Sequence, residues 1–279
     1  MILSEKEFRR LSQFIYNEVG IKMPDAKRTM LTGRLQKRLR ALKINSFREY
    51  CDFLFSDEGL KSELIHMIDV VTTNKTDFFR EPAHFEYITH TVLPEMMRKQ
   101  GYRSTKKVKI WSAGCSTGEE PYTLTMVLRE FQERCGDPDF FFEILATDIS
   151  TKVLSIAMRG IYHQDQIRPV PMALRKKYLL RSKDHDSDLV RVVAENRQLV
   201  KFARLNFMAE DFGFRDGVDV IFCRNVIIYF DKSTQERLIQ KFCRHLNPGG
   251  YLFLGHSESL HGLNNPLVQT APTVYRKPA

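Results

Sequence analysis

The stretch Lys107-Val-Lys-Ile-Trp-Ser-Ala-Gly-Cys-Ser-Thr-Gly-Glu-Glu-Pro-Tyr122 decides the fold, and a mostly apolar run follows it at residues 124–128. It predicts a buried strand, a turn of small residues and a helix that begins at once. Such a turn leaves backbone N–H groups beside open space, which is typical of nucleotide-cofactor sites. Gly114 and Gly118 remove Cβ atoms where a ligand would approach the backbone. The alternative is an ordinary strand-to-helix turn in a parallel sheet.

Two adjacent carboxylates, Glu119 and Glu120, stand at the predicted start of this helix. A helix start that binds phosphate would not usually carry two negative side chains, because they would repel the ligand. The pair therefore favours a cofactor with a positively charged end.

Strands and helices alternate after residue 107. Further strands are expected at residues 140–148, 219–225, 249–255 and 268–276, with helices at 150–159 and 233–246. This alternation predicts an α/β fold with a doubly wound, Rossmann-like sheet that binds ligands beyond the carboxyl ends of its strands. Asp148 falls at one such end, where an acid commonly binds both ribose hydroxyls. Its alternative role is to cap the helix that follows.

One stretch interrupts the alternation. Residues 177–180, 189–193 and 199–203 resemble short strands, and the very polar turn 182–188 joins the first two. We expect a small antiparallel β subdomain inserted at about residues 162–204. Either a platform for a partner or a structural decoration would fit this pattern.

The first 72 residues predict an all-helical domain. Ser4 with Glu7 and Ser46 with Glu49 have the spacing of capping boxes, and a second helix is expected from about Pro24 to residue 42. A linker and a first helix at residues 73–106 then lead into a catalytic domain at 107–279.

The second helix carries the densest positive charge in the chain. Its basic residues include Arg34, Lys37, Arg38 and Arg40, and no acidic residue occurs between positions 27 and 43. We expect these four side chains to dock an acidic substrate, because opposite charges guide association. A solvated helix face is the alternative.

A polar loop, Thr72-Thr-Asn-Lys-Thr-Asp-Phe-Phe-Arg80, follows the helical region. The two phenylalanines would anchor the loop to a core, and Arg80 would then be placed to hold a carboxylate with two hydrogen bonds. The alternative is an inter-helix linker with a surface arginine.

Composition limits the class of protein. The chain has 279 residues and a formal charge of +9, which implies an acidic partner such as nucleic acid, an anionic membrane surface or an acidic protein face. It has no apolar run of membrane-spanning length and no signal pattern at its start. Its five cysteines are scattered, which supports neither disulfides nor a metal site. We expect a cytoplasmic protein without membrane insertion.

Several motifs together resemble one family, the chemotaxis receptor methyltransferases known as the CheR family. The resemblance covers nearly the whole chain. It rests on residues 72–80, on 111–122, on Ala146-Thr-Asp-Ile149, on Leu205-Asn206, on Ile221-Phe-Cys-Arg-Asn-Val-Ile-Ile-Tyr-Phe230 and on Leu254-Gly-His-Ser-Glu258.

The resemblance implies methyl transfer from S-adenosylmethionine to glutamate side chains on the cytoplasmic helices of chemoreceptors, which gives methyl esters and S-adenosylhomocysteine. It implies that Arg80 holds the cofactor's carboxylate, that Glu120 meets its amino group and that Asp148 binds its ribose. The remaining implied residues are Asn74 and Thr76 beside Arg80, Asn206 and Phe207 at the adenine, and Arg224, Asn225 and Tyr229 facing the methyl group, with Arg80 and Tyr229 as the catalytic pair.

Two departures from related patterns bear on partners. The segment 224–229 lacks the Asn/Asp-Pro-Pro-Tyr run of enzymes that methylate amino groups, so no nucleic-acid partner is expected, although the basic helix keeps an RNA methyltransferase as the alternative. The turn 182–188 lacks the glycines with which relatives hold a C-terminal receptor peptide, so that tether is doubtful here. A non-catalytic, cofactor-binding docking protein is the second alternative. We expect a monomer.

Overall fold

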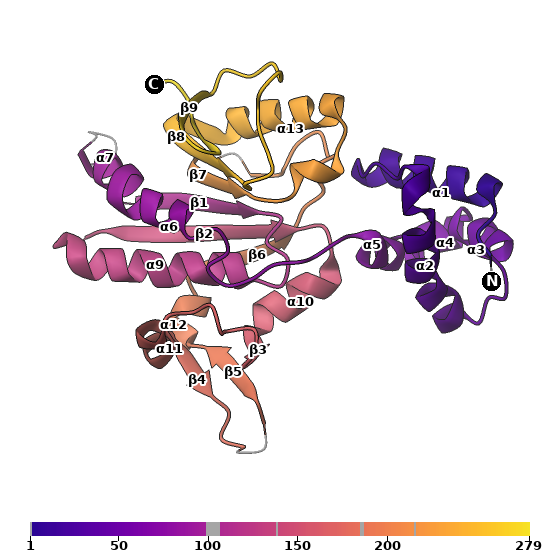
Figure 1. Cartoon of the computed structure of the whole chain (residues 1–279), viewed down its shortest axis with the longest axis horizontal. Coiled ribbons are helices and arrows are strands. Elements are labelled where there is room, and N and C mark those ends of the chain that lie inside the picture. The colour runs from indigo at the N-terminus through magenta and orange to yellow at the C-terminus, as the bar shows by residue number, and fades with distance from the viewer. Residues whose placement is uncertain (1, 99–106, 138, 185–186, 215) are drawn as a thin grey trace.

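The computed structural model describes residues 2–98, 107–137, 139–184, 187–214 and 216–279. Figure 1 shows three parts: a group of helices near the N-terminus, a large sheet with helices on both faces, and a small separate sheet. Part of the predicted linker, at residues 99–106, lies outside the described residues, as do two residues of the polar turn 182–188.

The N-terminal part consists of helices, as predicted. They are α1 (Glu5–Val19), the short η1 (Asp25–Lys27), α2 (Arg28–Leu42), α3 (Phe47–Leu54), α4 (Asp57–Ser62) and α5 (Leu64–Val71). The predicted capping box holds the start of α1, where Ser4 accepts from the backbone of Glu7 and the Glu7 side chain accepts from the backbone of Ser4. One apolar core, which includes Leu11, Leu31 and Leu35, packs these helices together.

A connecting segment links the helices to the large sheet. It contains α6 (Ala83–Tyr87), η2 (Ile88–Val92) and α7 (Leu93–Arg98). Ile88 and Val92 are buried in the same apolar cluster as Leu124, so this segment packs on the face of the sheet that α9 (Glu119–Cys135) also covers.

The large sheet has seven strands in the order β6-β2-β1-β7-β8-β10-β9. The strands are β1 (Lys107–Ala113), β2 (Phe141–Asp148), β6 (Val200–Arg204), β7 (Val218–Cys223), β8 (Leu246–Leu254), β9 (Val268–Ala271) and β10 (Val274–Arg276). The first five in spatial order run parallel, whereas β10 pairs antiparallel with both of its neighbours. The predicted Rossmann-like fold is confirmed.

Neighbouring residues of the strands face opposite sides of the sheet. Ile110 belongs to the cluster under α9, while the adjacent Trp111 packs with Phe242 of α13 (Lys232–His245) on the other side. This alternation places helices on both faces, as the doubly wound pattern requires. A further helix, α10 (Thr151–Arg159), follows β2 as predicted, and Ser150 caps it.

The small sheet has the predicted antiparallel pairing but a different membership. Its order is β3-β5-β4, with β3 (Ile161–His163), β4 (Leu179–Arg181) and β5 (Leu189–Val192), and the short helices α11 (Met172–Tyr178) and α12 (Ala194–Arg197) lie in the same stretch. The assignment of residues 199–203 to this subdomain was wrong. They lie in β6, which pairs parallel with β2 at the edge of the large sheet.

The C-terminal strand prediction also needs correction. Residues 268–276 form two strands, β9 and β10, because the chain turns back at Pro272 and Thr273. Thr273 adopts a positive φ of 56°, which favours a tight turn. The hairpin extends the parallel sheet with two antiparallel strands.

Candidate active site

A pocket lies beyond the carboxyl ends of β1, β2 and β7, where the fold predicts a ligand. The empty space along its walls, open solvent included, is about 880 Å³. Its lining comprises Val19, Ile21, Thr72, Thr73, Asn74, Lys75, Thr76, Arg80, Gly114, Ser116, Glu120, Asp148, Ile149, Asn206, Phe207, Arg224, Asn225, Val226, Tyr229 and Phe230. All ten residues predicted to be catalytic or cofactor-binding are in this set.

The turn after β1 brings its backbone against the pocket. Gly114 has a φ of +86°, and a Cβ atom there would lie 2.6 Å from a methyl carbon of Val226. Only glycine therefore fits this position without a shift of the neighbouring loop. Ser116, at a φ of 49°, donates its hydroxyl to the carbonyl of Asn74 at 2.8 Å, which ties the turn to the loop of residues 72–80.

Asp148 organises the same end of the pocket. Its two carboxylate oxygens accept backbone N–H bonds from Ser116 and Ser150, each at 2.9 Å. Burial raises the pKa of Asp148, and these backbone bonds oppose the rise. Each oxygen retains a second lone pair, so the carboxylate still has the capacity to accept hydrogen bonds from a ligand.

The two adjacent glutamates have different environments. Glu120 lines the pocket, accepts from the Ser112 hydroxyl at 2.7 Å and forms an ion pair with Arg224 at 2.7 Å. Glu119 lies outside the lining and accepts from the Thr117 hydroxyl instead. Burial raises the pKa of Glu119 to about 7. Of the two carboxylates, only Glu120, the one predicted to bind the cofactor, lines the pocket.

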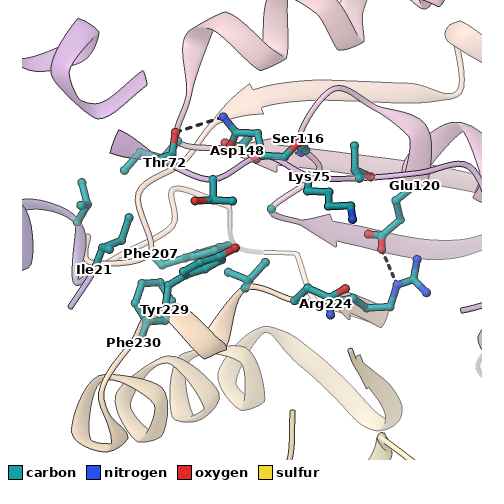
Figure 2. A pocket seen from close by; sticks show the side chains of 18 of the residues that line it. Ile21, Thr72, Lys75, Ser116, Glu120, Asp148, Phe207, Arg224, Tyr229 and Phe230 are labelled. Atoms are coloured by element: carbon teal, nitrogen blue, oxygen red, sulfur yellow. Dashed lines mark hydrogen bonds and ion pairs between the residues drawn. The ribbon is translucent and has the colours of Figure 1, made fainter. Parts of the chain in front are cut away.

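Arg224 is buried, and its polar atoms bind protein groups. Besides Glu120, it donates to the carbonyl of Arg80 at 2.6 Å and lies 3.6 Å from the carboxylate of Glu81. Figure 2 shows Arg224 paired with Glu120 at one end of the pocket, while Ile21, Phe207 and Tyr229 lie at the other end in this view. Arg224 therefore braces the loop that carries Arg80.

The loop of residues 72–80 carries Asn74, Thr76 and Arg80 into the lining. Arg80 is half-buried and donates to the carbonyl of Lys75 at 3.1 Å. The residues on both sides of it, Phe79 and Glu81, have a φ of 55°. Such left-handed conformations cost free energy in residues other than glycine, and they persist only where the surroundings fix them.

The N-terminal helices contribute to the pocket, which the sequence did not predict. Val19 and Ile21 line it. The backbone N–H of Lys22 donates to the Tyr229 carbonyl at 3.0 Å, and the side chain of Asn206 donates to the Glu18 carbonyl at 2.7 Å. No local pattern in the sequence connects residues 19–22 with residues 206 and 229. The only hint in the sequence was the polar side chain of Asn206, for which the sequence did not identify a hydrogen-bond partner.

The basic helix α2 is not a uniform docking face. Arg38 forms two hydrogen bonds with the buried carboxylate of Glu63, at 2.8 and 2.6 Å. Arg34 donates to the carbonyls of Val71 and Thr72. Both side chains hold the N-terminal helices together and are only partly exposed, so they have a structural role in the fold, and their docking role stays a prediction. Lys37 and Arg40, the other two predicted docking residues, are exposed.

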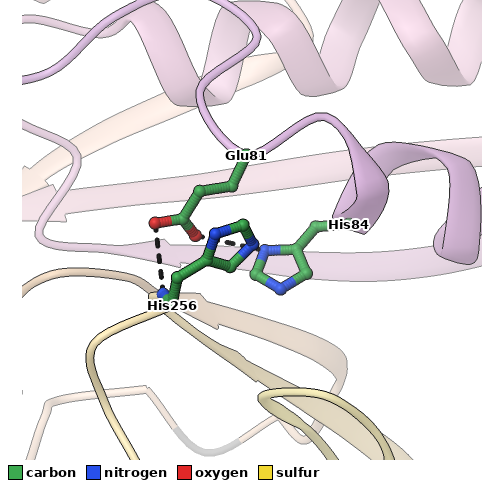
Figure 3. A group of neighbouring side chains, drawn as sticks. All are labelled: Glu81, His84 and His256. Atoms are coloured by element: carbon green, nitrogen blue, oxygen red, sulfur yellow. Dashed lines mark hydrogen bonds and ion pairs between the residues drawn. The ribbon is translucent and has the colours of Figure 1, made fainter.

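Figure 3 shows a cluster of Glu81, His84 and His256, none of which lines the pocket. Their ligand-type atoms lie within 4.8 Å of one another. The Arg224 guanidinium, however, lies 3.3 Å from Nδ1 of His84, and a second cation at this distance from a ligand atom would be repelled. Burial and Arg224 lower the pKa of His84 to about 4, so it stays neutral and accepts a hydrogen bond. Glu81 and His84 thus hold the Arg224 side chain in place rather than a metal ion.

Comparison with known proteins gives matches along nearly the whole chain. Residues 6–72 match the family description "CheR methyltransferase, all-alpha domain", and residues 74–275 match "CheR methyltransferase, SAM binding domain". A "Chemotaxis protein methyltransferase" of Borreliella burgdorferi is 39% identical over 99% of this chain and 95% of that protein. One of Escherichia coli is 37% identical over 99% of this chain and 92% of its own length.

The donor set fits S-adenosylmethionine. The pocket offers carboxylates for hydroxyl and amino groups, an arginine for a carboxylate, and apolar and aromatic walls for an adenine ring. Within the described residues, no helix is long and apolar enough to cross a membrane. The chain belongs to the CheR family of methyltransferases that use S-adenosylmethionine.

Proposed function

We propose that this methyltransferase modifies the carboxylates of glutamate side chains on the cytoplasmic helices of chemoreceptors, and that its products are glutamyl methyl esters and S-adenosylhomocysteine. The observation that carries the proposal is one pocket that is lined by residues from five of the six family motifs, together with relatives named chemotaxis protein methyltransferases along nearly their whole length. We further propose that the protein acts in the cytoplasm.

Each cofactor group has a suitable partner in this proposal. Asp148 would accept the ribose hydroxyls through its free lone pairs, and Arg80 would hold the carboxylate of the methionine part. Glu120 would accept from the amino group, because its pairing with Arg224 and Ser112 leaves lone pairs on both oxygens. Asn74 and Thr76 would complete that end, and Asn206 and Phe207 would contact the adenine.

The chemistry requires little from the protein beyond positioning. The cofactor supplies an activated methyl group on a positively charged sulfur. A glutamate with a pKa near 4.3 is already ionised at neutral pH, so no general base is needed. Formation of the ester removes the charge of the carboxylate, and this change is favoured where little water is present. The pocket residues therefore act by orienting the groups and excluding water.

Tyr229 is proposed to orient the substrate carboxylate as a hydrogen-bond donor. Its side chain lines the pocket, and its backbone is held by Lys22. Tyr229→Phe should lower kcat about tenfold at saturating cofactor and receptor, because one hydrogen bond to a charged group contributes about 1.5 kcal/mol or more. An unchanged kcat would remove this role from the tyrosine.

Lys37 and Arg40 are the docking residues that the proposal retains. Their exposed charges would attract acidic receptor helices. The double variant Lys37→Glu with Arg40→Glu should raise the KM for receptor and leave the Kd for S-adenosylhomocysteine unchanged. A matching rise in both constants would indicate misfolding instead. Receptor tail peptides should bind weakly, and a titration that shows tight binding would contradict this expectation.

The decisive experiment detects the ester itself. Receptor-containing membranes are incubated with the protein and with methyl-labelled S-adenosylmethionine, and the washed membranes are then treated with base. Methyl esters release volatile labelled methanol under these conditions, whereas methylated nitrogen does not. A parallel incubation with RNA serves as the control. Label that stays on the membranes after base treatment, or that enters the RNA, would contradict the proposed reaction.

A further inference from the structure

A buried carboxylate, Glu258, lies just after β8 and does not line the pocket. It is 4% exposed. Within the described residues, no lysine, arginine or histidine lies at ion-pair distance from it, so its hydrogen bonds come from backbone N–H groups. Burying an unpaired carboxylate is costly. The backbone hydrogen bonds must therefore offset the cost of burying the Glu258 carboxylate.

The bonds join two neighbouring loops. Oε2 of Glu258 accepts from the backbone N–H groups of Asn225 and Gly255, both at 2.7 Å. Oε1 accepts from the backbone N–H of Ile228 at 3.3 Å. The N–H groups of Asn225 and Ile228 belong to residues 225–229, the segment that follows β7 and enters the pocket. One carboxylate thus fixes both ends of that segment against the loop after β8.

The segment needs such a support because its backbone is strained. Asn225 has a φ of 60°, in the left-handed region that residues other than glycine adopt at a cost, although the cost is smaller for asparagine than for most. A Cβ atom at Gly255 would lie 2.5 Å from the side-chain nitrogen of Asn225, so the two loops are in close contact. A strained backbone persists only where its neighbours determine it, and here Glu258 supplies the hydrogen-bond acceptors.

The hydrogen bonds of Glu258 determine which side chains of residues 225–229 face the pocket and which face solvent. With the backbone held at residues 225 and 228, Tyr229 lines the pocket while Ile228 points outward and is 47% exposed. A rotation of the segment by one residue would exchange an aromatic hydroxyl for an apolar side chain at the pocket wall. The position of Tyr229 is therefore set from outside the pocket.

We propose that Glu258 is a positioning residue for methyl transfer, which holds residues 225–229 in the one backbone conformation that presents Asn225 and Tyr229 to the substrate carboxylate. It touches neither cofactor nor substrate. This inference rests on the function proposed above, because the role of Tyr229 is part of that function.

Two variants of different severity test the proposal. Glu258→Ala removes all the acceptors and should lower kcat about 100-fold, since a displacement of about 1 Å at a reacting group has that effect. Glu258→Gln retains one oxygen, which can still accept from Asn225 and Gly255, while its amide group faces the N–H of Ile228. Its kcat should lie between those of the wild type and of Glu258→Ala.

Asp219→Asn is the matched control. Asp219 lies at the opposite end of β7, where its carboxylate accepts from the backbone of Lys109 at 2.8 Å and from Asn247 at 2.8 Å. It is also a carboxylate that binds a backbone N–H group, but it is remote from the pocket. Asp219→Asn should lower thermal stability and leave kcat and the KM for cofactor unchanged.

A second readout does not depend on the substrate. Amide hydrogen exchange in residues 225–230 should become faster in both Glu258 variants and stay unchanged in Asp219→Asn, while S-adenosylhomocysteine should still bind to all three. A kcat within twofold of wild type in folded Glu258→Gln and Glu258→Ala, or unchanged exchange in the segment, would overturn the proposal. If the wild type forms no methyl ester, the proposed function fails, but the exchange experiment still decides whether Glu258 holds the segment.

Discussion

Replacement of Arg38 by alanine should unfold the N-terminal helices more easily without a direct effect on the active site. The guanidinium forms two hydrogen bonds with Glu63, whose side chain is 1% exposed, and the hydroxyl of Tyr50 binds the same carboxylate at 3.0 Å. Burial and the negative charge of Glu63 raise the pKa of Tyr50, so the tyrosine stays a neutral donor. Arg38 is the cation that balances this buried charge.

The expected cost follows from what Arg38→Ala leaves behind. Removing one partner of a buried ion pair typically costs about 3–5 kcal/mol, because the other charge stays buried and uncompensated. The Arg38 side chain is 19% exposed, so water can reach the vacated position, and the lower end of this range applies. The double variant Arg38→Met with Glu63→Gln removes both charges and should recover most of the loss.

Two probes separate the parts of the molecule during urea unfolding. The chain's single tryptophan, Trp111, is buried in the large sheet and reports only on that part by fluorescence. Far-ultraviolet circular dichroism reports on all helices, those of the N-terminal part included. Arg38→Ala should shift the dichroism transition to lower urea and shift the Trp111 transition less.

Lys37→Ala is the control, because Lys37 is an exposed neighbour on the same helix and its loss should change stability by no more than about 0.5 kcal/mol. The reasoning would be refuted if Arg38→Ala unfolded within about 0.5 kcal/mol of wild type and yet raised the KM for receptor. That result would indicate that Arg38 contacts the receptor and does not stabilise the helices. A combined loss of stability and activity would instead fit the structural role.

Two further predictions concern carboxylates near the pocket. Asp148→Asn should weaken binding of S-adenosylhomocysteine roughly 10- to 100-fold, as measured by calorimetry, because hydrogen bonds to a charged group contribute about 1.5–3 kcal/mol; unchanged affinity would exclude Asp148 from the site. Glu119→Gln should stabilise the protein by at most about 3 kcal/mol at pH 8 and by little at pH 4.5. The folded-state pKa of Glu119 is raised to about 7, so the folded chain holds the extra proton between pH 4.5 and 7 and wild-type stability falls as the pH rises through that window. Equal unfolding free energies of the two proteins at pH 8 would contradict the assigned burial effect.

The sheet and the pocket could be predicted from the sequence because both depend on local patterns. Apolar runs that end in Gly114 or Asp148 give strands, and the carboxyl ends of parallel strands meet at one edge. Residues at those ends must then lie close together. The edge strand β6 could not be assigned in this way, because short strands of the same composition pair parallel or antiparallel according to what lies beside them.

Local sequence patterns could not predict which residues pair with the charged side chains. Arg38 meets a glutamate 25 positions away, and Arg224 meets one 104 positions away. Within the basic helix no acidic residue occurs, so Arg34, Arg38 and Arg40 had the same prediction. The first two of these bind internal groups, whereas Arg40 is exposed. What distinguishes these arginines is whether folding brings a buried acceptor to them, and that depends on tertiary packing. A buried carboxylate such as Glu63 is therefore the better starting point, because it must find a donor, whereas a surface arginine need not find an acceptor.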